Sequence, residues 1–572
     1  MFYILSFLWF IQTLKSILFW LYLWQLKEYH IGRFVDHFRT EKGKRLIFNK
    51  LLIFKILLVF IFLSGFFLFG FEILPPPIFS SKTSLYFFEF LFTIPFLVII
   101  LYIFEAVRAL FIFFQKKLKK PIITKKIIFL ISTVLILEIL FIFILSLYSR
   151  DEWGNINLGL ATLSLLLFDI LTPALISGIV LVFQPLAVLA RNQIIKKAKE
   201  KRAKFKNLIV IGITGSYGKT STKEFLATIL SEKFKVLKTK EHQNSEVGIS
   251  QCILNDLKEE HEVFVVEMGA YNRGGIKLLC DITKPQIGIL TGINEQHMAI
   301  FGSQDNIVKT KYELIESLPE MGFTVFNGDN IYCRELYKMA PVSKRICYTT
   351  FSALADEVVQ GDFWASDIKL DKESLYFKVF SRWGERGVEF KLNLLGEHYA
   401  QNILMAAIVA KEVLGMTLEE IAKVSQKIKS EQGGMRLIKT KDGLNIIDAT
   451  YSANPDGVIS HLEYLKVWPG KKVIIMPCLI ELGQVSKEVH KRIGQKIGEV
   501  CYLAIITTKE RFRDIGEGAV EKGMPGENIL YTENSKEIFK KIKNFSQPDD
   551  IILLEGRVPS ELKNLLPERS ER

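Results

Sequence analysis

Five long apolar segments at the N-terminal end constrain the fold of this chain more than any other feature. Each is long enough to cross about 30 Å of hydrocarbon, for which roughly 20 helical residues are needed. The segments run from Phe2 to Leu26, Leu51 to Leu74, Leu85 to Phe114, Ile127 to Leu147 and Leu158 to Ala190. The sequence therefore predicts an α-helical, multi-pass membrane region of about five spans, which together with a basic connector occupies residues 1–206.

The charges between these segments predict their orientation. Residues 1–206 hold 26 Lys and Arg against 11 Asp and Glu, whereas the rest of the chain holds 48 against 50. Seven, six and eight basic residues follow the first, third and fifth segments, and the two other connections hold one each. Because basic loops remain on the cytoplasmic side, we expect a cell (inner) membrane protein with the N-terminus outside and everything after Arg191 in the cytoplasm.

The same distribution excludes several classes of protein. The formal charge of +13 belongs to the apolar part of the chain, which argues against nucleic acid as a partner and favours membrane lipid. The six cysteines show no CxxC spacing, which is typical of free thiols in a reducing compartment rather than a disulfide framework or a zinc ribbon.

A few ionisable residues interrupt the apolar segments, and each costs about 2.5–3.5 kcal/mol at the centre of a membrane helix. Glu105 and Arg108 lie three residues apart, so they can neutralise each other on one helix face. The alternative is that Arg108, like Glu89, lies near a helix end and reaches the lipid headgroups. Glu138 and Asp169 are harder to explain, and the sequence indicates no substrate for them.

A glycine-rich turn follows the basic connector. The β-branched run 208–213 predicts a buried strand, and an amphipathic helix is expected from Thr222. Between them lies Thr214-Gly215-Ser216-Tyr217-Gly218-Lys219-Thr220-Ser221. Such a turn between a strand and a helix cradles phosphate with backbone N–H groups, while Lys219 reaches the terminal phosphates and the Thr220 hydroxyl can bind Mg²⁺. Its spacing, GxxGxxGKT, differs from the usual GxxxxGK[ST].

Three further polar residues follow at the ends of predicted elements. Glu267 comes directly after the buried run 263–266, where an acid beside a phosphate loop is either a Mg²⁺ ligand or a solvated strand end. His297 follows the apolar run 287–290, and taken alone it would more often be a structural histidine. Lys311 comes later, within Lys-Thr-Lys-Tyr-Glu.

Taken together and in this order, these motifs resemble the Mur ligases of cell-wall synthesis. The resemblance covers residues 207–572 and continues in the segments 395–402, 434–437, 448–455 and 480–483. Tyr-x-Ala-Asn-Pro and Glu-Leu-Gly, within the last two segments, are most similar to the branch that adds D-alanyl-D-alanine to UDP-muramoyl tripeptide. The substrates implied are a cell-wall precursor and an amino acid or dipeptide.

The resemblance implies an α/β fold with two domains and a set of roles. A P-loop central domain would occupy residues 207–434 and a Rossmann-like C-terminal domain residues 435–572. ATP would bind at the segment from Thr214 to Ser221. Lys219, His297 and Lys311 would be catalytic residues.

The same resemblance implies metal and substrate ligands. Two Mg²⁺ ions would bind, with Thr220, Glu267, His297 and Lys311 as their ligands. Lys311 matches a lysine that the family carbamylates. Asn402 and Arg436 would contact the nucleotide. The cleft closed by the second domain would be lined by Asp448, Tyr451 and Asn454, and Glu481 falls in a family motif without a firm role.

Four departures from the family pattern concern the substrate more than the phosphate chemistry. The five apolar segments stand where the family has a domain that binds the UDP-sugar. Gly292 and Ser452 each stand where Asn is expected, and Leu554-Glu555-Gly556-Arg557 replaces Lys-Gly-Ser-Arg.

Other functions stay open on the sequence. A ligase forming another amide or a poly-amino-acid polymer at the membrane would share the same motifs. An ATP-driven transporter is the alternative of another class, although the LSGGQ signature of ABC transporters is not found. The sequence does not specify whether the acceptor is linked to a nucleotide or to a lipid, nor the oligomeric state. Residues 331–390 are expected to form a small β-rich insert of unassigned role.

Overall fold

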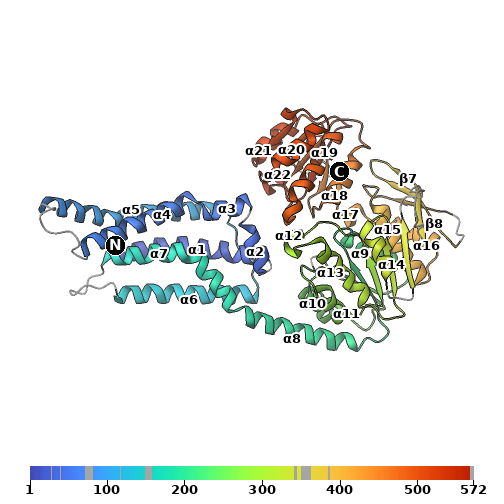
Figure 1. Ribbon diagram of the computed structural model, residues 1–572, viewed down its shortest axis with the longest axis horizontal. Helices are drawn as coiled ribbons and strands as arrows, with labels where there is room; N and C mark the ends of the chain where they lie inside the picture. The colour runs from blue at the N-terminus through green and yellow to red at the C-terminus, as the bar shows by residue number, and fades with distance from the viewer. Residues whose placement is uncertain are drawn as a thin grey trace. The chain divides into compact units, whose positions relative to one another are not determined.

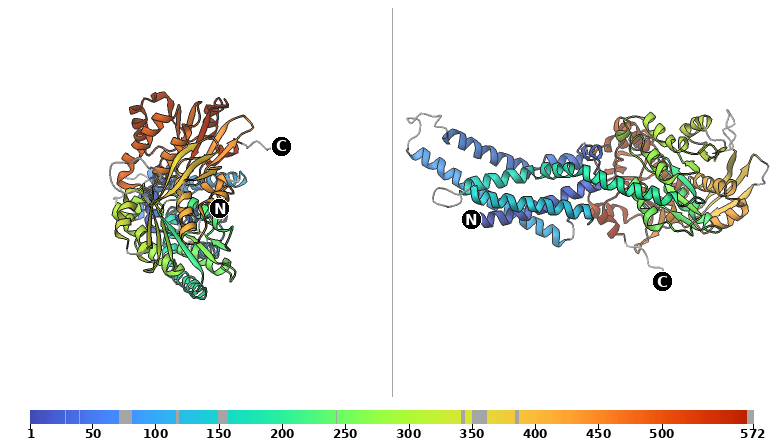
Figure 2. Two further views of the ribbon diagram at one scale, coloured as in Figure 1. Left: turned by 90° about the vertical axis from the view of Figure 1, so that its right-hand side faces the viewer. Right: turned by 90° about the horizontal axis from the view of Figure 1, so that it is seen from below.

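The computed structural model describes the chain except residues 28, 39, 71–80, 116–117, 149–156, 242, 341–343, 350–361, 384–386 and 567–572. The chain divides into two compact units, residues 1–190 and 191–572, which are considered separately (Figures 1 and 2).

The first unit is a bundle of long helices (Figure 1). These are α1 (Phe2–Leu26), α4 (Lys50–Gly70), α5 (Ser81–Phe114), α6 (Lys125–Tyr148) and α7 (Leu158–Val182), with short helices α2 (Ile31–His37) and α3 (Glu41–Ile47) between the first two. Five stretches are long and apolar enough to cross a membrane: Phe2–Leu26, Gly43–Ser64, Ile94–Phe114, Lys125–Tyr148 and Leu158–Val182. The helices agree with the sequence prediction, while the crossing itself and its orientation stay predictions.

The last apolar segment ends earlier than expected. Helix α7 stops at Val182, and a new helix, α8 (Gln184–Ala203), contains both the end of the segment and the basic connector. Pro185 accounts for the break, because it has no backbone N–H and cannot continue the hydrogen bonds of the preceding helix, whereas a first turn tolerates it.

A buried ion-pair cluster joins three helices of this unit. Lys55 Nζ on α4 lies 2.7 Å from Glu105 Oε2 on α5 and 2.5 Å from Asp169 Oδ2 on α7. Each of the three residues is at most 7% exposed. Pairing of Glu105 with Arg108 is therefore the wrong alternative: Arg108 is exposed, and the cation that meets Glu105 comes from another helix.

We expect Lys55→Met to destabilise the first unit by about 3–5 kcal/mol, because two buried carboxylates lose their counter-charge. Lys50→Met, at an exposed position of the same helix, is the matched control. Thermal unfolding of the purified full chain measures both. A further variant that also carries Glu105→Gln and Asp169→Asn should recover much of the loss; an unchanged melting temperature in Lys55→Met would contradict the assignment.

The second unit begins with a nine-stranded sheet of order β2-β3-β1-β4-β5-β6-β7-β8-β9. Strands β2 to β7 pair in parallel, and β8 and β9 continue the sheet antiparallel. Buried β-branched runs such as β1 are typical of parallel strands covered by helices on both faces. The strands are β1 (Ile209–Thr214), β2 (Val236–Lys238), β3 (Val263–Glu267), β4 (Ile287–Leu290), β5 (Phe323–Asn327), β6 (Lys344–Thr349), β7 (Phe363–Leu370), β8 (Leu375–Ser381) and β9 (Val388–Leu392).

The helices that accompany this sheet differ from expectation at two places. Helix α9 begins at Lys219, three residues before the predicted start, because Gly218 adopts a left-handed conformation (φ 74°) and caps it. The expected insert at 331–390 is instead α14 followed by strands β6 to β9 of the main sheet, although 341–343, 350–361 and 384–386 lie outside the described residues. The helices are α9 (Lys219–Leu230), α10 (Glu246–Asp256), α11 (Gly275–Thr283), α12 (Met298–Phe301), α13 (Gln304–Glu316), α14 (Ile331–Met339), α15 (Tyr399–Glu412), α16 (Leu418–Ser425) and α17 (Ser430–Gly433).

A second sheet of six strands follows, in the order β10-β11-β15-β12-β13-β14. Only β10 and β11 are antiparallel, so the rest has the parallel arrangement of a Rossmann-like domain. Its elements are β10 (Arg436–Lys439), β11 (Asn445–Ala449), α18 (Pro455–Leu465), β12 (Lys472–Met476), α19 (Ser486–Val500), β13 (Leu503–Ile506), α20 (Phe512–Glu521), β14 (Ile529–Tyr531), α21 (Ser535–Ile542), β15 (Ile551–Glu555) and α22 (Ser560–Asn564).

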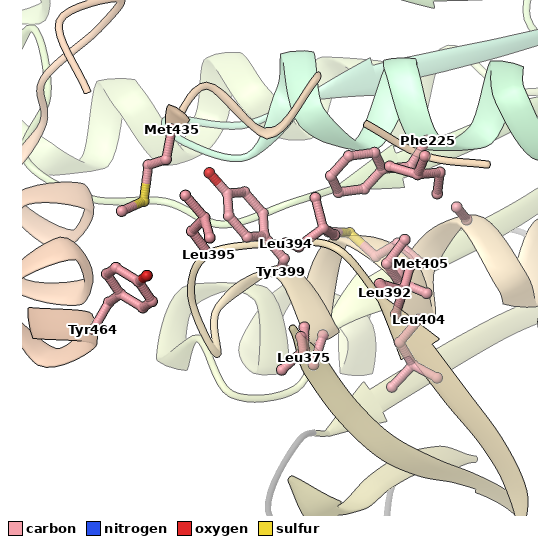
Figure 3. Close-up of a cluster of buried hydrophobic side chains, with 14 of the residues drawn as sticks. Phe225, Leu375, Leu392, Leu394, Leu395, Tyr399, Leu404, Met405, Met435 and Tyr464 are labelled. Carbon is pink, nitrogen blue, oxygen red and sulfur yellow. The ribbon is translucent and has the colours of Figure 1, made fainter. Parts of the chain in front are cut away.

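One apolar core continues from the first sheet to the second (Figure 3). Helix α15 is buried along nearly its whole length, as expected of a helix that is apolar on all sides. The Tyr399 hydroxyl on this helix donates to Gly433 O (2.6 Å), which also accepts from Ser221 Oγ (3.1 Å) on α9. Gly433, in the connection between the two sheets, is thereby hydrogen-bonded to the helix that follows the phosphate loop.

Candidate active site

The predicted phosphate loop connects β1 to α9 with two glycines that no other residue could replace without displacement. A Cβ on Gly215 (φ 154°) would lie 2.0 Å from Thr291 Oγ1, and one on Gly218 would lie 2.9 Å from Asn402 Oδ1. No side chain caps α9, so its first backbone N–H groups remain available for an anion. The loop thus has the shape and the donors of a phosphate cradle.

Lys219, Thr220 and Glu267 meet at this loop. Lys219 Nζ donates to Gly215 O (2.8 Å) and Ser216 O (3.2 Å). Thr220 Oγ1 donates to Glu267 Oε2 (3.0 Å) at the end of β3. Although burial opposes ionisation, the charges of Lys219 and a second lysine, Lys223, lower the pKa of Glu267. A hydroxyl beside an ionised carboxylate is a donor set that suits Mg²⁺.

A pocket opens beside the loop and is lined by all three predicted catalytic residues, Lys219, His297 and Lys311. They come from α9, from the cap of α12 and from α13. The pocket is lined by Gly215, Ser216, Lys219, Asn244, Gly269, Ala270, Tyr271, Gln296, His297, Phe301 and Lys311. Three segments that are distant in sequence are therefore brought to one place.

Lys311 is a buried amine in this pocket. It is 4% exposed, and its Nζ lies 6.0 Å from the centre of the Phe301 ring. Burial, together with the nearby charge of Lys219, lowers the pKa of Lys311 to about 7. A substantial share of the amine is therefore neutral, and hence nucleophilic, near pH 7.

His297 is held on one side by an aromatic ring and on the other by a carboxylate. The Tyr271 ring meets it edge-on at 5.1 Å between centres. His297 Nδ1 lies 2.6 Å from Glu481 Oε2, which comes from the turn after β12 of the second sheet. Burial lowers the pKa of His297 in spite of this carboxylate, so the neutral imidazole, with one nitrogen able to bind a metal, is favoured.

Of the residues predicted to contact nucleotide, Asn402 lies at the loop, and Arg436 begins the first strand of the second sheet. The Asn402 side chain faces Gly218. Arg436 instead lies on β10, where it is in register with Asp448 on β11.

Of the three predicted cleft residues, Asp448 lies near the end of β11 and the other two follow it, and their surroundings differ. Asp448 binds Thr450 (3.1 Å to its backbone N) and Lys563 (3.1 Å), and despite burial these contacts lower the pKa of Asp448. Asn454 accepts from Gly457 N (3.1 Å) as the cap of α18, and from Asn294 Nδ2 (3.2 Å) of the first domain.

Tyr451, the third of them, lies close to the phosphate loop. Burial, together with the charge of Glu267, raises the pKa of Tyr451 to about 12. Its hydroxyl shares a hydrogen bond with Thr220, so the second domain reaches the carboxylate and hydroxyl that flank the loop.

Sequence reasoning missed three residues that complete this arrangement. Asn244 Nδ2 donates to Glu267 Oε1 (3.0 Å). Lys223 is fully buried, with its Nζ 3.5 Å from Glu267 Oε2. Asn294 Nδ2 donates to Asp456 Oδ2 (2.7 Å) across the two domains. Only the position of Lys223, one helical turn after Lys219, was a usable signal in the sequence.

The unexpected Gly292 is explained by the loop residue Tyr217. A Cβ at position 292 would lie 2.3 Å from the Tyr217 ring. The Tyr217 hydroxyl accepts from Asn330 Nδ2 (3.3 Å), which fixes the ring over the glycine. The Tyr217 ring thus occupies the space that a side chain at position 292 would need.

Among the described residues, no group of three or more His, Cys, Asp or Glu side chains is placed to hold a metal by itself. A cation in this pocket would therefore depend on the Thr220 hydroxyl, on Lys311 or on phosphate oxygens in addition to Glu267 and His297. That donor set, rich in oxygen and completed by a bound phosphate, is the one Mg²⁺ takes at nucleotide sites.

Comparison with known proteins assigns the family. Residues 213–410 match the Mur ligase middle domain, and residues 433–558 match the Mur ligase glutamate ligase domain. The chain belongs to the Mur ligase family, whose members are ATP-dependent carbon–nitrogen ligases.

Individual relatives share one enzyme name. The UDP-N-acetylmuramoyl-tripeptide–D-alanyl-D-alanine ligase of Bacillus subtilis is 29% identical over 366 residues, which is 63% of this chain and 76% of the relative. The enzyme of the same name from Buchnera aphidicola is 30% identical over 338 residues, covering 59% and 70%. The crystal structure of MurF ligase from Thermotoga maritima in complex with ADP is 27% identical, with a TM-score of 0.55 over 64% of this chain and 80% of that one.

We expect Gly292→Asn to destabilise the second unit by about 1–3 kcal/mol, because the added side chain overlaps the Tyr217 ring and forces repacking. Adding Tyr217→Ala should recover at least half of the loss by vacating the shared space. Thermal unfolding and nucleotide binding of both variants check this. A fully tolerated Gly292→Asn would show that the ring moves freely and does not constrain the loop.

Proposed function

We propose that this chain is a membrane-anchored, ATP- and Mg²⁺-dependent amide ligase of peptidoglycan precursor synthesis. It activates a carboxylate as an acyl phosphate and joins it to an amino acid or dipeptide. The reaction is most like the addition of D-alanyl-D-alanine to UDP-muramoyl tripeptide, the activity named for its relatives.

One observation carries the proposal: Lys219, His297 and Lys311 line a single pocket beside the loop 214–221. Glu267 is bound to Thr220 at the same loop. A phosphate loop alone would serve any nucleotide-dependent protein. The buried Lys311 and His297 add two groups that would bind metal where a carboxylate is activated.

The residues of the pocket fit ATP and Mg²⁺. The Gly215–Gly218 cradle leaves room for phosphate, and Lys219 would contact the β- and γ-phosphates. Thr220, Glu267 and His297 would hold metal, together with Lys311 as its carbamate. When bound, Mg²⁺ supplies positive charge that lets two anions approach each other.

In this reaction the protein must orient the carboxylate, the γ-phosphate and the amine, and it must exclude water. A carboxylate oxygen of the acceptor attacks the γ-phosphorus and ADP leaves; the amine then attacks the acyl carbon, loses a proton, and phosphate leaves. Lys219 stabilises charge that develops on the transferred phosphoryl group. Closure of the second domain, which brings Tyr451 and Asn454 to the loop region, would align the amine and protect the acyl phosphate, where effective molarities of about 10⁵–10⁸ M become available.

The environment of Lys311 supports carbamylation. Only a neutral amine reacts with CO₂, and burial together with Lys219 lowers the pKa of Lys311 to about 7. The product is an anion near the cation Lys219, so a repulsive pair of charges becomes an attractive one. The buried position at 4% exposure then protects the carbamate from hydrolysis.

The membrane part of the proposal is supported by the first unit. Five helices are long and apolar enough to span, and the excess of basic residues falls on alternate connections. Anchoring would bring the cytoplasmic ligase to a lipid-linked acceptor or to neighbouring enzymes of the same synthesis.

The direct test incubates the purified full chain with ATP, Mg²⁺, UDP-muramoyl tripeptide and D-alanyl-D-alanine, and follows phosphate release. We expect release that needs both substrates. Release with glutamate chains but not with this pair would overturn the assignment in favour of a polymer-forming ligase. ATP hydrolysis without any acceptor would favour transport.

Lys311→Ala should reduce ligation by about 10²–10³-fold, because an anion that positions metal and phosphate is lost. Short carboxylic acids added to the assay should restore part of the rate by occupying the vacated space. Lys309→Ala, on an exposed position of the same helix, is the control. Unchanged activity in Lys311→Ala would remove the carbamylation from the proposal.

A further inference from the structure

The segment 294–299, which contains His297, contacts the second ligase domain through several hydrogen bonds. Glu481 Oε2 lies 2.6 Å from His297 Nδ1, and Ala299 N donates to Glu481 O (2.9 Å). The Glu481 residue is 8% exposed. The contact between the histidine and the carboxylate is therefore fixed by both a side chain and a backbone hydrogen bond.

Both residues hold an uncommon backbone conformation. His297 has a φ of 65° and Glu481 a φ of 64°, and they are two of only five described non-glycine residues with positive φ. Such conformations are unfavourable for residues with a Cβ and persist where the surroundings enforce them, often at functional sites. Here two of them face each other across a domain boundary.

The geometry is that of a metal-binding histidine and its supporting acceptor. Histidines that bind metal through one ring nitrogen almost always donate the other N–H to a carboxylate or carbonyl, which fixes the tautomer and the ring orientation. With Nδ1–H directed at Glu481, the lone pair of Nε2 is free for a metal. The Tyr271 ring restricts rotation about the same imidazole.

We propose that Glu481 is a positioning residue that completes His297 as a metal ligand from the opposite domain. This inference rests on the proposed ligase function. The carboxylate reaches His297 only when the second domain lies against the first. Occupation of the His297 metal site is therefore coupled to domain closure, so that the site is complete when the amine and the activated carboxylate are enclosed together.

The same interface offers a contact that does not involve the histidine. Arg492 Nη1 lies 3.3 Å from Glu295 Oε1, and both side chains are partly exposed. Arg492→Ala thus weakens the interface between the domains without touching the imidazole, and serves as a matched control.

The experiment uses the full chain with Mn²⁺ in place of Mg²⁺ and a non-hydrolysable ATP analogue. Pulsed EPR detects ¹⁴N coupling when an imidazole binds Mn²⁺. We expect this coupling in the unaltered protein and in Arg492→Ala, and its loss in Glu481→Gly. The glycine suits the positive φ at this position, so the variant removes the carboxylate without adding strain. Half-saturation by Mn²⁺ should shift about 10–100-fold in Glu481→Gly.

Glu481→Gln tests the role of the acceptor more finely, because its amide oxygen can still accept from Nδ1–H and should restore most of the coupling. Retained ¹⁴N coupling in Glu481→Gly would overturn the inference, as would equal loss in Arg492→Ala, since the effect would then reflect the interface in general. Absence of coupling in the unaltered protein would also overturn it. None of these readouts requires turnover, so they are independent of the acceptor assay.

Discussion

The parallel pairing of β1 with β3 on one side and β4 on the other is the constraint on which the site depends. In this register Ile213 lies opposite Glu267, and Thr214 lies opposite Leu290. The carboxyl ends of the three strands therefore share one edge of the sheet. The phosphate loop, the acid and the segment leading to His297 all leave the sheet there, so a slip of one strand would separate them.

Local sequence was sufficient to predict the residues that sit at strand ends. The strand–glycine–helix pattern placed Lys219 and Thr220, and the acid directly after a buried run placed Glu267. The contacts of Glu481, Asn244 and Lys55 could not be predicted in the same way, because each partner is more than 20 residues away and on a different element. Such pairs are set by how helices and sheets pack, and spacing along one element carries no information about them.

The first unit shows the same limit, and its buried charges give a physical reason for the way its helices are arranged. Two apolar clusters, one around Trp9 and Leu165 and the other around Trp24 and Ile176, occupy different lengths of the bundle. Asp169 lies between them along α7, and it is there that Lys55 binds. Burying charge is costly without a partner, so the ion pairs fix which helices neighbour one another, a choice that uniformly apolar surfaces cannot make.

Charge is distributed differently in the ligase unit, and this bears on how it attracts a polyanionic nucleotide. The chain after residue 206 has 48 basic and 50 acidic residues, so no overall field draws ATP to it. The attraction must be local, from Lys219, from the buried Lys223 and from the N-terminus of α9. Carbamylation of Lys311 would add a negative charge near them. A divalent cation would offset that charge, and under the inference above the carboxylate that supports its histidine ligand would arrive as the second domain closes.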